Sequence, residues 1–299
     1  MTTSAASFRA PALGEMRRLE IGGTRIQAHV TGEGPPIVFV HGVLVNANLW
    51  REVVPLLEGY TRVSLDLPLG SHLETQGENA DLSAPALAGL ISGALESLGL
   101  DDATVVGNDT GGALTQIAVT TDPQRIGRVV LTSCDAFDNF PPRFFRIVFA
   151  PARLPGGLVA GFAPMRIRAL RRLPIAYGWL SKRPVEPAVS DSWVLPVLSD
   201  RGVRRDLQRV LAGIDVRYTL QAAQRLRSFD RPVLLAWSKE DRFFPAEHAE
   251  RLAALLPDAR LEWIEDSLSF SPEDQPERLA GLIRSFVPAN APAPAESPS

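Results

Sequence analysis

The sequence predicts an α/β fold: a mostly parallel, eight-stranded sheet with helices on both faces and a helical insert. Short apolar runs alternate with helical patterns along most of the 299 residues, which is typical of a parallel sheet covered on two sides. A hairpin signal opens the series, so we expect an antiparallel edge. A stretch of roughly ninety residues without strand signals interrupts the alternation, and excursions of that length are usually functional lids.

The first half of the chain supplies six of the eight predicted strands. Two of them flank the turn at Gly22 and Gly23, which has the composition of a hairpin. Continuous apolar runs predict four more buried strands, at residues 36–40, 62–66, 104–106 and 128–132. Between them, residues 82–98 have the spacing of an amphipathic helix, with Asp81 before it and Gly99 after it.

The second half begins with the insert and then returns to alternation. Two further strands are expected at residues 232–237 and 260–264, followed by a last helix at 274–286. The termini are rich in Ser and Ala or in Pro and Ala, which predicts disorder. The expected units are a flexible N-terminus (1–16), a core (17–134 and 230–287), a helical lid within it (135–229) and a disordered tail (288–299).

Composition limits the classes of function. The formal net charge is −3, so no overall positive field points to nucleic acid. The single cysteine, Cys134, excludes an internal disulfide and suits a reducing compartment. Residues 1–16 lack the apolar stretch of a secretory signal, and no segment is apolar enough to span a bilayer. We therefore expect a cytoplasmic protein that acts on a small molecule, without metal, cofactor, nucleic-acid partner or membrane span.

The segment from Gly107 to Gly111 joins a predicted strand to a predicted helix. Its two glycines flank Asp109, and such a turn has no room for side chains on either side of its apex. It also raises the apical side chain above the sheet edge, near the positive end of the following helix. The pattern is that of a nucleophile elbow with aspartate at the apex. The alternative is an ordinary strand–helix turn in which Asp109 caps the helix.

Four motifs in order make residues 17–287 resemble the α/β-hydrolase family, in particular its branch with an aspartate nucleophile: haloalkane dehalogenases, epoxide hydrolases and fluoroacetate dehalogenases. His41 to Val43 resembles the family's oxyanion loop, and Gly107 to Gly111 resembles its elbow. Trp237 to Asp241 resembles the strand that carries the second acid. Residues 264–286, with Glu273 to Pro276, resemble the closing segment.

The resemblance implies a role for each motif. Asp109 would attack carbon and form an ester, and the backbone N–H groups of Val43 and Thr110 would bind the oxyanion during its hydrolysis. Asp241 would be the second acid. His41 would lie by the substrate pocket, where a structural tether of its loop is the favoured role over catalysis.

The closing segment departs from the family, because Ser269 occupies the position of the catalytic histidine. A serine hydroxyl has no basic site suited to general-base catalysis near neutral pH. Of the four histidines in the chain, His72 is the candidate substitute, since it follows a strand at the catalytic end of the sheet. Asp135, after the sixth strand, is a weaker alternative to Asp241 as the supporting acid.

Other departures concern the substrate. Val43 and Thr110 stand where haloalkane dehalogenases place the Asn and Trp that hold halide, so a halide site is not expected. Epoxide hydrolases protonate the opening oxygen with lid tyrosines, and Tyr177 and Tyr218 are the candidates here, although core packing is the alternative. Trp50 and Phe270 complete the predicted pocket. An arginine-rich run in the lid is either a solvated face or a gate for acidic substrates, and comprises Arg166, Arg168, Arg171, Arg172, Lys182 and Arg183.

Two functions follow from this pattern. The first is a hydrolase in which Asp109 forms an ester with a small, mostly apolar substrate of the epoxide or haloalkane type. The second is a non-hydrolytic protein of the same fold, either a small-molecule binder or an isomerase- or cyclase-like catalyst that uses Asp109 for acid–base chemistry. Ser269 distinguishes them, because hydrolysis of the ester needs a base whereas binding or proton shuttling does not.

Overall fold

The computed structural model describes residues 5–154 and 156–289. Within them, eight strands form one sheet in the order β1-β2-β4-β3-β5-β6-β7-β8. The pairs β1–β2 and β2–β4 are antiparallel and the other pairs are parallel, which confirms the predicted architecture. The strands are β1 (Glu15–Ile21), β2 (Thr24–Thr31), β3 (Pro36–Val40), β4 (Thr61–Asp66), β5 (Ala103–Asp109), β6 (Ile126–Cys134), β7 (Val233–Ser238) and β8 (Ala259–Ile264).

Two helical layers cover the sheet. One is a row in which α2, α3, α8 and α9 contact each other in turn, and α2 buries an apolar stripe at helical spacing that includes Leu87, Ile91 and Leu95. The other layer is formed by α11 and the short 3₁₀ helices η1 to η3, which also contact one another. These elements are α2 (Ala84–Ser97), α3 (Thr110–Thr121), α8 (Val216–Leu226), α9 (Ala246–Leu255), α11 (Pro276–Phe286), η1 (Pro11–Leu13), η2 (Ala47–Trp50) and η3 (Val54–Leu56).

The N-terminal segment packs on the core, which corrects the predicted flexibility of residues 1–16 for the part that is described. Leu13 is fully buried, and the Arg9 guanidinium donates to the Asp66 carboxylate over 2.6 Å. The Ala10 N–H donates to the side chain of Asn48. Composition missed this packing because its partners are distant in sequence. Residues 1–4, and residues 290–299 of the predicted tail, lie outside the described residues.

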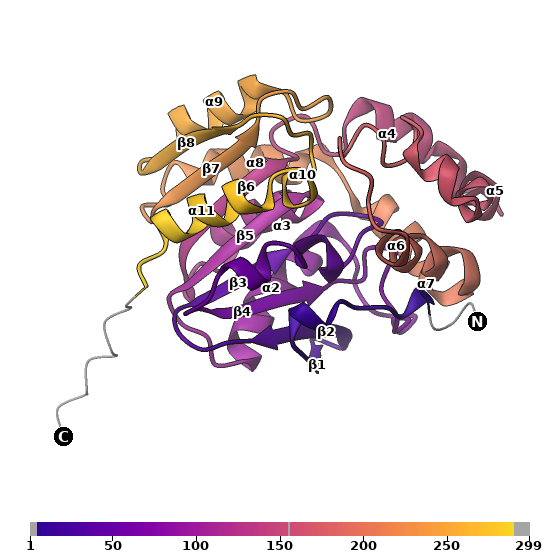
Figure 1. The fold of residues 1–299 in the computed structure, drawn as a ribbon, viewed down its shortest axis with the longest axis horizontal. Coiled ribbons are helices and arrows are strands. Elements are labelled where there is room, and N and C mark those ends of the chain that lie inside the picture. The colour runs from indigo at the N-terminus through magenta and orange to yellow at the C-terminus, as the bar shows by residue number, and fades with distance from the viewer. Residues whose placement is uncertain (1–4, 155, 290–299) are drawn as a thin grey trace.

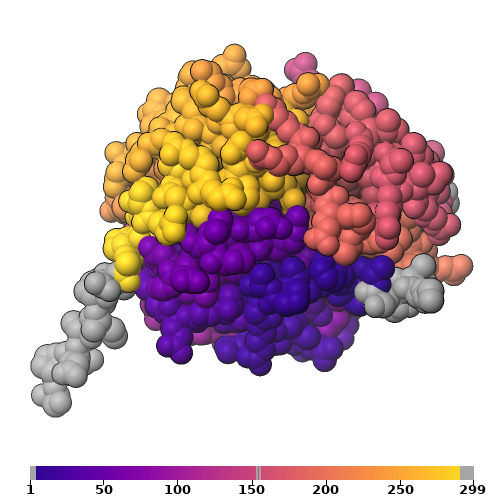
Figure 2. All heavy atoms as spheres, in the orientation of Figure 1, coloured from indigo at the N-terminus to yellow at the C-terminus, as the bar shows by residue number. Residues whose placement is uncertain are grey.

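The lid elements gather at one end of the sheet (Figure 1) and form one lobe of the molecular surface (Figure 2). The predicted lid ends too late in the sequence. Its last helix, α8, packs against α3 and α9 in the layer on the sheet, so it is the ordinary crossover before β7. The lid elements are α4 (Arg143–Val148), η4 (Ala150–Arg153), α5 (Gly157–Phe162), η5 (Ala163–Arg166), η6 (Arg168–Arg172), α6 (Pro187–Ser199) and α7 (Arg201–Gly213). In the part of the chain that the structure describes, no helix has the length and apolarity to cross a membrane.

Two acids of the closing segment hold distant parts of the chain together. They belong to the short helix α10 (Ser271–Asp274). Glu273 forms a buried, bidentate salt bridge with Arg51, in which Nη2 and Oε2 are 2.9 Å apart. Asp274 is fully buried and accepts from the backbone N–H groups of Lys182, Arg183 and Leu268. The closing segment that resembles the family therefore also anchors the lid, through the hydrogen bonds of Asp274.

Replacing Glu273 with glutamine will destabilise the fold, because the buried Arg51 guanidinium loses its buried counter-charge and, among the described residues, keeps only the exposed Glu52 and Glu186 as ion-pair partners. Breaking a buried ion pair from one side costs about 3 kcal/mol. The free energy of unfolding from urea denaturation measures the loss. The matched control is Glu262→Gln, which disrupts the exposed pairs of Glu262 with Arg260 and Arg278 and should cost less than about 1 kcal/mol. Equal losses in the two variants would contradict the prediction.

Candidate active site

Asp109 sits at the apex of a sharp turn between β5 and α3. Its backbone has φ 54° and ψ −130°, a region that non-glycine residues avoid and that is enriched at functional sites. Glycines permit the turn: a Cβ on Gly111 would collide with the carbonyl oxygen of Val40, and one on Gly107 would lie 2.7 Å from the Cα of Gly112. The elbow predicted from residues 107–111 is therefore present as a backbone conformation.

The Asp109 carboxylate lies against the loop that follows β3. A Cβ on Gly42 would collide with its Oδ2 atom, so this glycine makes room for the acid. The backbone N–H of Thr110 donates to the same carboxylate, as an oxyanion donor at that position would. Leu44, with φ 60°, is held on both sides, since its N–H donates to Leu69 and its carbonyl accepts from the Tyr177 hydroxyl over 2.8 Å.

A cavity of about 500 Å³ opens in front of Asp109. Its walls are mainly apolar side chains of the lid, among them Phe145, Phe162 and Leu170. Its polar lining residues include Asp109, Thr110 and Asp135 from the core and Tyr177 from the lid. A mostly apolar cavity with a few converging polar groups is the usual form of a small-molecule site.

Three acids follow neighbouring strands: Asp109 ends β5, Asp135 follows β6 and Asp241 follows β7. The register pairs Asp109 with Cys134, which places Asp135 one residue beyond. Burial is the main reason that the pKa of Asp109 is raised to about 7, and repulsion from Asp241 adds to it. Burial and the nearby Asp109 raise the pKa of Asp135 well above its usual value. Buried carboxyls this close do not all ionise near neutral pH.

Asp135 has one engaged and one unengaged oxygen. Its Oδ2 atom is 3.3 Å from the Thr110 hydroxyl, which donates to it. Its Oδ1 atom is buried and has no hydrogen-bond partner among the described residues. The sequence made Asp135 a weaker candidate for the supporting acid than Asp241. Its place directly after β6, the strand next to the elbow strand β5, indicates that it lies beside Asp109.

Asp241 and Ser269 are joined by a hydrogen bond. The Ser269 hydroxyl donates to Oδ1 of Asp241 over 3.0 Å, and the same oxygen accepts from the N–H groups of Phe243 and Phe244. The Oδ2 atom of Asp241 is buried and has no hydrogen-bond partner in the part of the chain that the structure describes. Burial raises the pKa of Asp241 to about 6. Neither Asp241 nor Ser269 is among the residues that line the cavity.

The two histidines of the predicted site, His41 and His72, form hydrogen bonds with the backbone of neighbouring loops. His41 is fully buried, with Nδ1 against the Gly42 carbonyl and Nε2 accepting from the Leu67 N–H, and burial lowers its pKa. His72 accepts from the Gly70 N–H and lies 3.4 Å from Asp206 of α7. Neither of them lines the cavity of Asp109, so the expectation of a pocket position for His41 is wrong and His72 is not placed to act as a base there.

The aromatic residues of the predicted pocket divide in the same way. Tyr177 lines the cavity, whereas Trp50 and Phe270 are fully buried and pack in the interior, against Phe39 and Trp193. Tyr218 lies outside the cavity lining on α8, where its hydroxyl accepts from Arg217. Of these four aromatic residues, only Tyr177 therefore lies in the pocket as predicted, and its hydroxyl already donates to the Leu44 carbonyl.

Among the described residues, no group of three or more metal-ligating side chains could hold a metal ion.

The model of the protein family described as alpha/beta hydrolase fold matches residues 35–276 of the chain. These residues contain the elbow, the loop after β3 and the second acid. The chain belongs to the α/β-hydrolase fold family.

Proteins similar to this chain carry various names. An uncharacterized protein of Mycobacterium tuberculosis is 28% identical over 91% of this chain and 81% of its own length. The 2-hydroxy-6-oxononadienedioate/2-hydroxy-6-oxononatrienedioate hydrolase 1 of Dechloromonas aromatica is 26% identical over 87% of this chain and 90% of its own. The haloalkane dehalogenase DatA of Agrobacterium tumefaciens superposes with a TM-score of 0.76 at 19% identity, covering 93% of this chain and 98% of that one. At that identity the superposition supports the fold alone.

For this α/β-hydrolase-fold protein, the raised pKa of Asp109 predicts how stability depends on pH. In the unfolded chain the carboxyl titrates near 3.8, and in the folded protein near 7. Between these values the folded state holds a proton that the unfolded state has lost, so stability falls as the pH rises from about 4 to about 7. Replacing Asp109 with asparagine removes this contribution and should raise Tm near neutral pH by about 2–4 °C for each kcal/mol regained.

Melting curves of the wild type and Asp109→Asn over this pH range test the prediction. The difference in Tm between Asp109→Asn and the wild type should increase with rising pH and become constant above about pH 7. Asp258→Asn, at an exposed turn before β8, is the control and should track the wild type. A Tm difference that is independent of pH would show that Asp109 titrates normally.

Proposed function

We propose that this protein is a hydrolase that opens epoxide-type substrates, small and mostly apolar, through an ester on Asp109. The observation that carries the proposal is the pairing of two carboxyls in one apolar cavity: Asp109 on the strained elbow, and Asp135 with an unengaged oxygen beside it. Such an arrangement offers a nucleophile and a proton donor to the same substrate, provided that one carboxyl is ionised and the other protonated. The raised pKa of each carboxyl supports this assignment near neutral pH.

In the first step, the ionised Asp109 attacks a ring carbon of the epoxide. A carbon–oxygen bond forms as the ring bond breaks, and the protonated Asp135 gives its proton to the departing oxygen. The products are a hydroxyalkyl ester on Asp109 and an ionised Asp135. The proton donor is thus a carboxylic acid of the protein core, since the Tyr177 hydroxyl is engaged by Leu44.

In the second step, Asp135 takes a proton from water, and the resulting hydroxide attacks Cγ of Asp109. The N–H groups of Val43 and Thr110 bind the oxyanion of the tetrahedral intermediate. Collapse of this intermediate expels the alkoxide, which receives the proton of the carboxylic acid formed on Asp109. The cycle ends with a diol, an ionised Asp109 and a protonated Asp135, and it needs no histidine. Asp241, held by Ser269, acts at a distance by keeping the pKa of Asp109 high.

Epoxides fit the site better than haloalkanes. Opening an epoxide needs a proton donor, which Asp135 supplies, whereas a departing halide needs hydrogen-bond donors that hold an anion. The side chains at the two positions where haloalkane dehalogenases hold halide are those of Val43 and Thr110, and the Thr110 hydroxyl already donates to Asp135. A relative named as a hydrolase, that of Dechloromonas aromatica, supports hydrolytic chemistry on this fold.

A panel of epoxides and alkyl halides tests the proposal. We expect turnover of at least one apolar epoxide, and intact-mass analysis of stopped reactions should detect a transient adduct on the protein. In ¹⁸O-labelled water, a single turnover should place the label on Asp109 and leave the diol unlabelled, because water attacks the carboxyl carbon. Label in the diol after one turnover would contradict an ester intermediate. If neither turnover nor adduct occurs, even in Ser269→His, the non-hydrolytic alternative replaces the proposal.

A further inference from the structure

The lid has an unusual charge. Between Asn139 and Val185 the sequence contains eight arginines and one lysine and no aspartate or glutamate, although the whole chain has a net charge of −3. The lid segment therefore carries a strong local positive charge. Some of it is neutralised by acids outside the segment: Asp191 binds Arg168 and Arg171, and Lys182 contacts Glu240 and Asp266.

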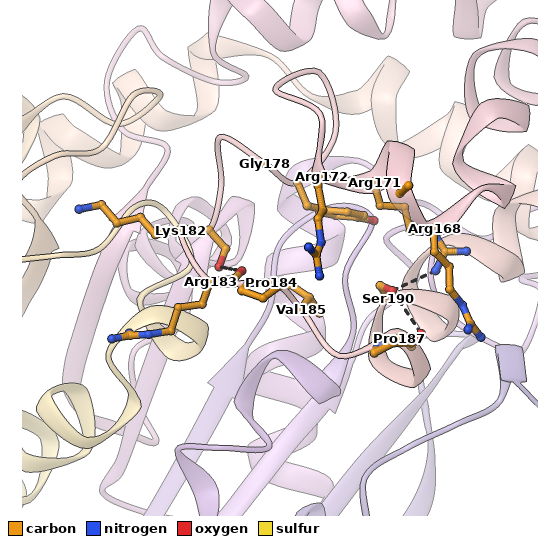
Figure 3. A pocket seen from close by; sticks show the side chains of 13 residues that line it. Arg168, Arg171, Arg172, Gly178, Lys182, Arg183, Pro184, Val185, Pro187 and Ser190 are labelled. Atoms are coloured by element: carbon orange, nitrogen blue, oxygen red, sulfur yellow. Dashed lines mark hydrogen bonds between the residues drawn. The ribbon is translucent and has the colours of Figure 1, made fainter.

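Other cations of the lid are not neutralised in this way. Arg143, Arg166 and Arg172 are exposed, and within the described ranges none of the three takes part in a salt bridge. Arg172 belongs to a cleft of about 470 Å³ that it shares with Arg168, Lys182 and Arg183 (Figure 3). Tyr177 lines both this cleft and the cavity of Asp109. Most of the arginine-rich run predicted as a solvated face or a gate thus lines a cleft next to Tyr177, and Leu170 and Leu173 of the same segment line the cavity of Asp109.

Exposed apolar side chains concentrate on the same lid. Among the described residues, eight large hydrophobic side chains are exposed, and six of them belong to the lid: Ile147, Leu154, Val159, Ile167, Leu173 and Ile175. The exposed fraction is 76% for Ile147 and 58% for Ile175. These two and Leu173 also line the cavity of Asp109, so its rim is apolar. Exposed apolar side chains that lie together, as these three do around one cavity, are a feature of interaction surfaces.

We propose that this face of the lid docks on an anionic membrane surface. Such a surface has a layer of anionic phosphates over a hydrocarbon boundary. Arginine and lysine side chains can bind the phosphates, while the apolar side chains between them insert into the hydrocarbon boundary. Each cation near an anionic bilayer strengthens binding about fivefold. The docked face includes the rim of the cavity, so an apolar ligand can pass from the bilayer to Asp109 without crossing water.

Vesicle co-sedimentation tests the docking. The full chain is mixed with vesicles of phosphatidylcholine alone, or of phosphatidylcholine with an equal amount of phosphatidylglycerol. We expect binding to the anionic vesicles, weak binding to the neutral ones, and loss of binding as the salt concentration rises. Arg166→Gln with Arg172→Gln should weaken binding about 25-fold, and Ile147→Ser with Ile175→Ser by about tenfold or more.

The matched control combines Leu220→Ser with Arg227→Gln. Leu220 is an exposed apolar residue of α8, outside the lid, and Arg227 is an exposed residue just after this helix; this variant should bind like the wild type. Circular dichroism and Tm check that each variant is folded. Asp109→Asn should bind vesicles normally, which separates this proposal from the enzymatic one.

Three results would overturn the docking. The first is equal binding to neutral and anionic vesicles, and the second is equal loss in the lid variants and the control. The third is absence of vesicle binding together with self-association in sedimentation velocity that Ile147→Ser with Ile175→Ser abolishes, which would assign the lid face to a second copy of the chain.

Discussion

Asp109→Asn will abolish epoxide turnover, with a fall in kcat of at least about 10⁴-fold. The amide has nearly the same shape as the carboxylate, so the elbow and the cavity should persist. It cannot attack carbon to form an ester, because its nitrogen lone pair is delocalised and its oxygen carries no charge. The protein adduct seen in stopped reactions of the wild type should be absent in this variant.

Asp258→Asn is the matched control and should leave both turnover and adduct unchanged. The Asp109→Asn variant should also be at least as stable as the wild type near neutral pH, because the buried carboxyl whose pKa is raised costs stability there. Loss of activity with unchanged or higher Tm would therefore place Asp109 in the chemistry and not in the fold. An adduct that persists in Asp109→Asn would mean that another residue is the nucleophile.

Asp135→Asn will separate the two half-reactions. The asparagine carbonyl can still accept from the Thr110 hydroxyl as Oδ2 of Asp135 does, but the amide neither gives nor takes the proton. Epoxide turnover should fall about 10²- to 10⁴-fold, the range of general acid–base catalysis. With an activated alkyl halide, whose leaving group needs no proton, the ester should still form on Asp109 and then persist, because its hydrolysis lacks the base.

Asp138→Asn is the control for this experiment, since Asp138 is exposed in the same loop. Intact mass over time measures both formation and decay of the ester. Rapid decay in Asp135→Asn would assign the base to another group, and His72→Ala and Asp241→Asn would then be compared in the same assay. The wild-type rate should also fall at low pH through about pH 7, as Asp109 takes up a proton.

The elbow and the sheet could be predicted from the sequence because their signals are local. Gly107 and Gly111 flank Asp109 within five residues, and the apolar runs that form strands are each continuous. Period, glycine position and the order of the motifs therefore predicted the architecture and the apex of the turn. These features depend on the covalent geometry of short segments.

The sequence by itself determined the fold class, the candidate nucleophile and the presence of Ser269 at the position expected for the catalytic histidine. Only the tertiary structure decided which polar groups share the cavity. The parallel register of β5 and β6 brings Asp135 beside Asp109, whereas packing removes His72 and Phe270 from the site. The physical reason is that burial and neighbouring charge, which set the pKa and the role of each group, arise from contacts between segments far apart in the chain.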